Sequence, residues 1–219
     1  ATMYISGSNE QMTQNSLGRI EADICVGGVL GYNDENTRVY IKNVENTTPI
    51  IADAAIAYNE QAGRNTDYAN RDYDYTYSYA GGIVGKASRN MTIDSCSNAS
   101  SGTVSTMGTY TGGMVEVNEG LITSCKTNSF GKSSDDYIGG ICGLNKVSGN
   151  ITNCSAEKVT ISGRNIVAGI AAENFGTILG SNISNLRILA AGKEVIDVAT
   201  GELSTDGVSA AIAAYNEGF

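Results

Sequence analysis

The sequence contains no histidine and no tryptophan, and proline occurs once in 219 residues. Without histidine the chain lacks the usual general base and the commonest metal ligand, which excludes Ser-His-Asp and Cys-His catalysis here. Lys and Arg number 14 against 23 Asp and Glu, and this formal charge of −9 argues against nucleic-acid binding. No apolar run approaches the roughly 20 residues that span a bilayer. The first residues also lack the basic and apolar segments of a signal peptide. We expect neither membrane insertion nor a nucleic-acid partner.

The five cysteines are an odd number and contain no C-x-x-C pair, which is the usual signature of a zinc or redox site. Cys96, Cys125 and Cys154 are separated by 29 and 29 residues, and each ends an Ile-x-Ser/Asn-Cys segment. The spacing predicts one column of small buried side chains rather than a metal or disulfide site. We expect no metal ion and no cofactor.

Glycine, in contrast, is abundant, with 27 residues, and much of it lies in a recurring Gly-Gly-aliphatic-x-Gly pattern. Clean copies begin at Gly27, Gly81 and Gly139, degenerate ones at Gly112 and Ala168, and weak ones at Asp53 and Ala210. The second small residue falls at positions 28, 82, 113, 140 and 169, so the steps are 54, 31, 27 and 29. We interpret the first step as two units, with the weak copy at Asp53 near its middle. A fixed period in this range indicates stacked units.

One repeat, residues 137–167, contains about three short segments of strand-like alternation joined by turns, and no segment shows helical periodicity. Short strands repeated in tandem predict an all-β fold, a parallel β-helix or β-solenoid of about seven coils. We expect it to be right-handed because parallel crossovers are right-handed. The chain is long enough for one such domain at residues 20–219, and residues 1–19 are expected to be a partial coil or cap.

Asparagine and tyrosine recur at fixed offsets from the glycine motif. The asparagines are Asn33, Asn118, Asn145, Asn174 and Asn216, with Asn59 in the weak copy. They predict a structural ladder at a corner, with left-handed backbone angles and hydrogen bonds to the coils above and below. Tyr79, Tyr110 and Tyr137 precede the motif by two residues and are expected to point outward and stack. Cys25 begins that column and is the most plausible exposed thiol.

Segments 81–85 (GGIVG) and 139–145 (GGICGLN), followed by a turn and 151–154 (ITNC), resemble the GLUG motif. The resemblance covers most of residues 20–186 and decays at Ala54. Such repeats occur in bacterial surface proteins, in adhesin-like proteins and in the non-catalytic part of IgA-cleaving metallopeptidases. The resemblance implies an extracellular β-helical stalk or adhesion module, and it brings no catalytic residues.

The first departure from the repeat is a tyrosine-rich insertion at residues 60–78. Its alternating tyrosines continue into the tyrosine column and predict an exposed aromatic patch that binds a partner, with sugar faces stacking on rings and carboxylates holding hydroxyls. The candidate residues are Tyr73, Tyr75, Tyr77, Tyr79, Tyr110, Tyr137, Asp72 and Asp74. The alternative is that the tyrosines pack under their own loop or against a neighbouring coil. Asp72 with Asp74, and Asp135 with Asp136, match no calcium motif and are expected to be solvated.

The second departure is residues 186–207, in which segments 187–190 and 194–198 are expected to pair as a projecting hairpin around residues 191–193. The last residues begin another coil, so we expect the chain to be a monomeric segment of a longer protein.

These features favour a non-catalytic stalk or adhesion module at the bacterial cell surface, with a host glycan or surface protein as partner. The alternative is an accessory domain of a large extracellular metallopeptidase or glycan-active enzyme whose catalytic domain lies elsewhere. A lyase acting within this chain is a third hypothesis, but no basic residues cluster at aligned offsets to support it, and fold alone does not give function.

Overall fold

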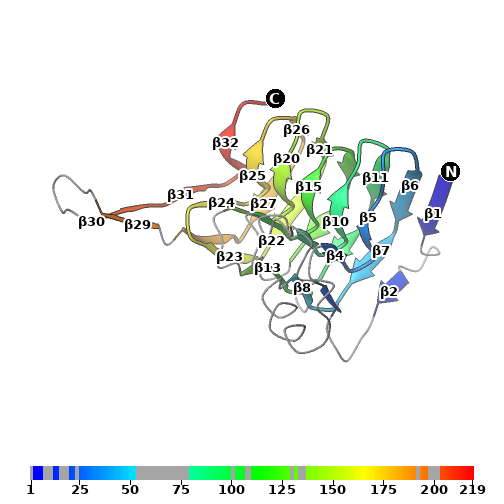
Figure 1. The fold of residues 1–219 in the computed structure, drawn as a ribbon, viewed down its shortest axis with the longest axis horizontal. Coiled ribbons are helices and arrows are strands. Elements are labelled where there is room, and N and C mark those ends of the chain that lie inside the picture. Colours follow the sequence, from blue (N-terminus) through cyan, green and yellow to red (C-terminus); the bar gives the residue numbers. More distant parts are fainter. Residues whose placement is uncertain are drawn as a thin grey trace, which may run out of the picture.

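The computed structural model describes residues 2–6, 12–14, 20–22, 25–52, 79–99, 102–106, 110–128, 131–132, 137–190, 193–196 and 203–219. These residues contain strands and no helix, and all of the strands except the pair β29 and β30 form five parallel sheets of six strands each (Figure 1). The chain passes through the five sheets in the same order in each turn, so equivalent strands lie side by side. The predicted all-β parallel β-helix is confirmed.

The sheets are numbered here in the order in which the chain meets them. Sheet 1 contains β1 (Thr2–Ser6), β6 (Arg38–Lys42), β11 (Met91–Asp94), β16 (Leu121–Thr123), β21 (Asn150–Thr152) and β26 (Thr177–Leu179). Sheet 2 contains β2 (Met12–Gln14), β7 (Val44–Asn46), β12 (Ser97–Asn98), β17 (Lys126–Thr127), β22 (Ser155–Glu157) and β27 (Asn182–Ser184). Sheet 3 contains β3 (Ile20–Ala22), β8 (Ile50–Ala52), β13 (Val104–Thr106), β18 (Gly131–Lys132), β23 (Thr160–Gly163) and β28 (Arg187–Ala190). Sheet 4 contains β4 (Cys25–Gly27), β9 (Tyr79–Gly81), β14 (Tyr110–Gly112), β19 (Tyr137–Gly139), β24 (Ile166–Ala168) and β31 (Val208–Ala210). Sheet 5 contains β5 (Leu30–Tyr32), β10 (Val84–Ala87), β15 (Val115–Asn118), β20 (Cys142–Asn145), β25 (Ala171–Asn174) and β32 (Ala213–Asn216).

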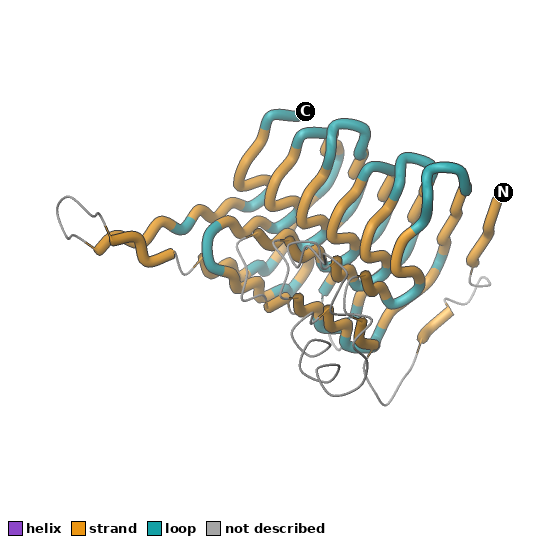
Figure 2. The backbone as a smooth tube through the Cα atoms, in the orientation of Figure 1, coloured by secondary structure: helices purple, strands orange, loops and turns teal. Residues whose placement is uncertain are grey.

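Each turn therefore carries five short strands rather than about three (Figure 2). The glycine motif bends at its second and third residues and divides between sheets 4 and 5. Within the repeat at residues 137–167, segment 155–157 is also a strand, β22. Strands of two to four residues hold too few positions for a period of two to be recognised.

The 54-residue step is a single turn, so its interpretation as two units is wrong. Cys25 pairs with Tyr79 and Gly27 with Gly81, which places β4 directly against β9 with no layer between them. The weak copy at Asp53 lies outside the described residues, in a connection from β8 to β9 that includes the expected 60–78 insertion. The described residues give six strands per sheet, and the expected count of about seven coils is not confirmed.

Identical apolar side chains stack along the interior. In sheet 1, Ile41, Ile93, Ile122 and Ile151 occupy one register position on four consecutive strands, and all four are fully buried. Each contributes about 2–3 kcal/mol by its burial. These isoleucines belong to the main buried apolar cluster, and a smaller cluster of Val26, Ile50, Ala52, Ala80 and Val104 lies beside sheets 3 and 4 of the first turns.

The second glycine of the motif is required by close approach of the backbone. A Cβ atom on Gly82, Gly113 or Gly140 would lie far inside van der Waals distance of the carbonyl oxygen of its equivalent in the next turn. Any side chain at this position would push adjacent turns apart.

The asparagine ladder is confirmed in part. Asn118 Nδ2 donates to Asn145 Oδ1 at 2.8 Å, Asn145 to Asn174 at 2.7 Å, and Asn174 to Asn216 at 2.6 Å. Ala87 interrupts the ladder between Asn33 and Asn118. At this gap Asn33 Nδ2 donates to Ser88 Oγ at 2.6 Å instead.

The expected left-handed backbone lies elsewhere. It occurs at the corner between sheets 1 and 2, at Asn43, Ser95, Ser124, Asn153 and Gly180, and in two turns at the corner between sheets 2 and 3, at Lys158 and Asn185. The ladder asparagines are not among the positive-φ residues. Left-handed geometry therefore belongs to the two corners that flank sheet 2, and not to the corner of the amide ladder.

The residue that follows the left-handed position between sheets 1 and 2 is cysteine in three turns. Cys96, Cys125 and Cys154 are free and buried, and Cys96 N donates to Cys125 Sγ at 3.4 Å. The predicted column of small buried side chains is confirmed.

The C-terminal hairpin exists with different partners from those expected. Segment 187–190 is β28 and pairs in parallel with β23 in sheet 3. The antiparallel hairpin is formed by β29 (Lys193–Ile196) and β30 (Leu203–Asp206), which extend away from the stacked sheets in Figure 1.

Candidate functional site

The outer face of sheet 4 carries the tyrosine column. Tyr110 pairs with Tyr137 in register, and their ring centroids are 4.8 Å apart with the planes tilted by 33°. The next residue inward on each strand, Thr111 or Ile138, is buried, whereas the tyrosines are half-buried. The expected outward stacking is thus confirmed for these two rings. Tyr79 occupies the same position on β9 and is also half-buried.

Cys25 begins this column, as expected, and pairs with Tyr79. It is the one cysteine of the five that is not fully buried. Burial, and then the charge of Glu116, raise the pKa of the Cys25 thiol to about 12. Its S–H donates to the Gly31 carbonyl at 3.0 Å, so the thiol stays protonated at neutral pH.

Two charged side chains from the outer face of sheet 5 reach the tyrosines. Lys86 Nζ lies 5.6 Å from the centroid of the Tyr79 ring, a cation–π contact. Tyr110 Oη donates to Glu173 Oε2 at 2.6 Å, across two turns of the helix. Burial, and then this hydrogen bond, raise the pKa of Tyr110 well above its usual value. The outer faces of sheets 4 and 5 therefore form one aromatic and charged surface.

A buried carboxylate lies beneath this surface and was missed by sequence reasoning. Glu116 occupies the third glycine position of its motif copy, is 2% exposed, and accepts the Ala80 N–H. Strands β9 and β14 share one register pair, Gly81 with Gly112, whereas β14 and β19 share three. The replacement of glycine by glutamate at position 116 was the visible signal.

The longer connections enter sheet 4 at one corner, the one that leads from sheet 3. They are residues 53–78 before β9 and 191–207 before β31. Insertions on one side of a solenoid are typical of a binding face. Five of the predicted site residues lie in the first of these connections, outside the described residues: Asp72, Tyr73, Asp74, Tyr75 and Tyr77. Asp135 and Asp136, which precede β19, also lie outside the described residues.

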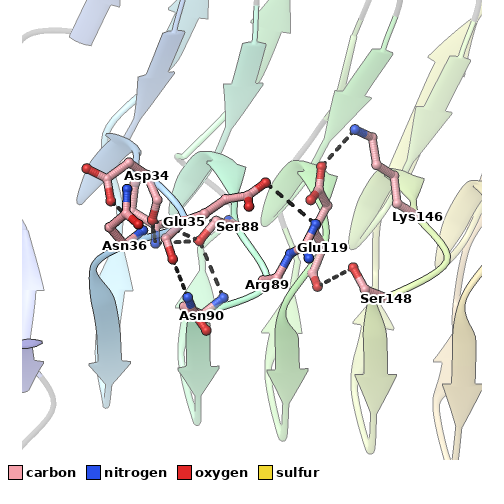
Figure 3. Close-up of polar contacts among 10 residues, drawn as sticks. Asp34, Glu35, Asn36, Ser88, Arg89, Asn90, Glu119, Lys146 and Ser148 are labelled. Carbon is pink, nitrogen blue, oxygen red and sulfur yellow. Dashed lines mark hydrogen bonds and ion pairs between the residues drawn. The ribbon is translucent and has the colours of Figure 1, made fainter.

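The turns from sheet 5 to sheet 1 form a second polar region, shown in Figure 3. Arg89 lies 3.6 Å from Glu35 and Lys146 lies 2.7 Å from Glu119. Ser148 Oγ also donates to the Glu119 carbonyl at 2.9 Å. The Lys146 hydrogen bond lowers the pKa of Glu119. Carboxylates and cations alternate from turn to turn here, so these charges are paired.

A second stacked tyrosine pair lies on sheet 1 and was not anticipated. Tyr4 and Tyr40 are register partners with ring centroids 5.0 Å apart and nearly parallel planes. Tyr4 is 74% exposed. The pair has no motif around it, so only its register position in the folded chain reveals it.

Over the part of the chain that the structure describes, no group of three or more Cys, Asp or Glu side chains is placed to hold a metal ion. The same residues contain no helix of the length and apolarity needed to cross a membrane. No protein-family model, curated protein or solved structure matches this chain.

Proposed function

We propose that this chain is a non-catalytic β-helical module that displays a binding surface, as a stalk or adhesion segment of a secreted or cell-surface bacterial protein. The observation that carries the proposal is the tyrosine column on the outer face of sheet 4, beside the corner where the longer connections enter. The GLUG resemblance supports the extracellular setting. A host glycan or surface protein is the proposed partner.

The architecture supports a display role because the backbone of the β-helix sets the position of each outer side chain along its axis. Five parallel sheets continue through six strands each, and parallel strands lie about 4.8 Å apart. Asparagine side chains also link consecutive turns from Asn118 to Asn216. Groups on the outer face are therefore held at regular intervals on a stiff support.

A binding screen with two matched tyrosine variants tests the proposal. The immobilised protein is screened against glycan and host-protein arrays, and each ligand is remeasured with Tyr137→Ala and with Tyr40→Ala. We expect Tyr137→Ala to weaken binding at least about tenfold, because a packed aromatic contact contributes more than about 1.4 kcal/mol. Tyr40→Ala, on sheet 1, should leave binding unchanged. Equal effects of the two variants, or no effect of either, would contradict a binding role for the sheet 4 surface.

A further inference from the structure

Three carboxylates in the first four turns are paired with cations, and two carboxylates in the last two turns accept tyrosine hydroxyls. Lys42 lies 3.0 Å from Asp94, and Arg89 and Lys146 pair with Glu35 and Glu119. By contrast, Glu173 accepts the hydroxyl of Tyr110 and Glu217 accepts that of Tyr215. Among the described residues, neither Glu173 nor Glu217 forms an ion pair.

These two carboxylates belong to one strip, which we call the Tyr–Glu strip: Tyr110, Glu173, Tyr215 and Glu217. Glu173 and Tyr215 are register partners on β25 and β32, so the strip runs across consecutive turns. Phe175 lies beside it, 5.8 Å from the Tyr215 ring. Lys86 shares the outer column of sheet 5 but lies three strands away from Glu173, about 14 Å at the usual strand spacing.

The side chains of the strip offer hydrogen-bond acceptors but no remaining donors. Both phenol hydrogens are used on carboxylates, so the remaining polar atoms are lone pairs on carboxylate and phenol oxygens. A surface that offers acceptors and negative charge is complementary to a group that has only donors and positive charge. Lysine and arginine are the side chains with this property, and their aliphatic stems pack on aromatic rings.

We propose that the Tyr–Glu strip binds a lysine or arginine side chain of a protein partner, with Glu173 as the main acceptor. Glu173 is half-buried among aromatic rings, and the reduced exposure to water strengthens its attraction for a cation. An uncharged hydroxyl of a glycan would leave this charge uncompensated. The inference rests on the proposed function, because it assigns the partner chemistry of the same surface.

A peptide titration followed by NMR tests the strip directly. The labelled protein is titrated with a glycine–serine heptapeptide that contains two lysines, and with the analogue that contains norleucine at both positions. Because the chain carries a net charge of −9, Glu157→Gln, which removes an exposed carboxylate on β22 in sheet 2, is the matched control for Glu173→Gln. We expect the lysine peptide to give saturable shifts at amides 110–112, 171–174 and 213–217.

Glu173→Gln should weaken this binding at least about tenfold, as expected for a hydrogen bond to a charged group, whereas Glu157→Gln should change it little. The tyrosine bond is retained because glutamine keeps an oxygen acceptor, and an unchanged melting curve would check this. Equal weakening by both variants, or equal shifts with norleucine, would overturn the proposal. If Tyr137→Ala abolishes binding of a screened ligand that Glu173→Gln leaves unchanged, cation recognition is wrong and the display function stands. The reverse result would remove the proposed role of the tyrosine column and keep the strip.

Discussion

The motif glycines and the tyrosine column come from the same stretch of each repeat, yet they vary to different extents. The second small residue of the motif is glycine in five of the six turns, at positions 28, 82, 113, 140 and 169, and alanine at 211. The outer column, three residues earlier, runs from cysteine through three tyrosines to Ile166 and Val208. The motif glycines meet backbone from the next turn, whereas the outer Tyr110 and Tyr137 are half-buried and contact each other through their rings. The fold therefore restricts the inner column and leaves the outer one free to acquire a binding role.

The largest test of this difference is Gly140→Ala compared with Tyr137→Ala. The alanine Cβ would overlap the Gly169 carbonyl, which the backbone of the next turn holds in place. We expect Gly140→Ala to lower the free energy of unfolding by at least about 3 kcal/mol. Tyr137→Ala should lower the free energy of unfolding by about 1–2 kcal/mol, because the tyrosine side chain is only half-buried. Urea unfolding followed by circular dichroism measures both, and a larger loss for Tyr137→Ala would contradict the distinction between inner and outer columns.

Substitutions in the asparagine ladder should give the next largest change in the free energy of unfolding. Asn145→Ala removes the donor to Asn174 Oδ1 and one acceptor of Asn118 Nδ2, which then donates only to the Gly120 carbonyl, and both remaining side chains are buried. We expect a loss of about 2–3 kcal/mol, because unsatisfied buried polar groups are costly. Asn216→Ala, at the exposed end of the ladder, should lose about 1 kcal/mol. Similar losses at both positions would show that burial does not determine the contribution of the ladder.

The free energy of unfolding should rise when the buried polar side chain of Thr111 is replaced by an apolar one. The Thr111 side chain is fully buried, and its Oγ1 has no hydrogen-bond partner among the residues that the structure describes. In four of the other five turns the equivalent residue is apolar, Val26, Ala80, Ile138 or Val167, and in the last turn it is Ser209, which is exposed. Thr111→Val should raise the free energy of unfolding by about 1 kcal/mol. Thr123→Val, on the outer side of β16, should change it by less than about 0.5 kcal/mol. Destabilisation by Thr111→Val would mean that the hydroxyl has a role in the core.

The sequence predicted the columns because a fixed period turns an offset into adjacency in space. Asn118 and Asn145, or Tyr110 and Tyr137, are neighbours for this reason alone. The period could not give the strands within a turn, because these are too short to show alternation. The period also led to the 54-residue step being interpreted as two turns, although it is one. Spacing alone cannot distinguish a degenerate copy of the motif from a long connection.

Contacts between different columns were also beyond reach of the sequence. The Tyr110–Glu173 bond joins sheet 4 to sheet 5 across two turns, and it depends on the angle between the sheets rather than on an offset. Glu116 was visible as a departure from the motif, but its bond to Ala80 required the folded backbone. The unpaired carboxylates of the Tyr–Glu strip likewise appear only when the ion pairs of the other turns are known.

The smallest expected effect concerns the paired charges of the outer turns. The hydrogen bond and charge of Lys146 lower the pKa of Glu119 in the folded protein, while burial opposes them. A lowered folded pKa means that the pair stabilises the fold above the unfolded pKa, about 4.3, and that this contribution is lost as the pH falls through the folded value. Because both side chains are partly exposed, Glu119→Gln should cost less than about 1 kcal/mol at pH 7, and its difference from the parent protein should disappear near pH 2. Urea unfolding at both pH values, with Glu157→Gln as control, measures the change. A difference that persists in acid would show that Glu119 acts through packing, and the paired turns would then resemble the inner columns rather than the outer face.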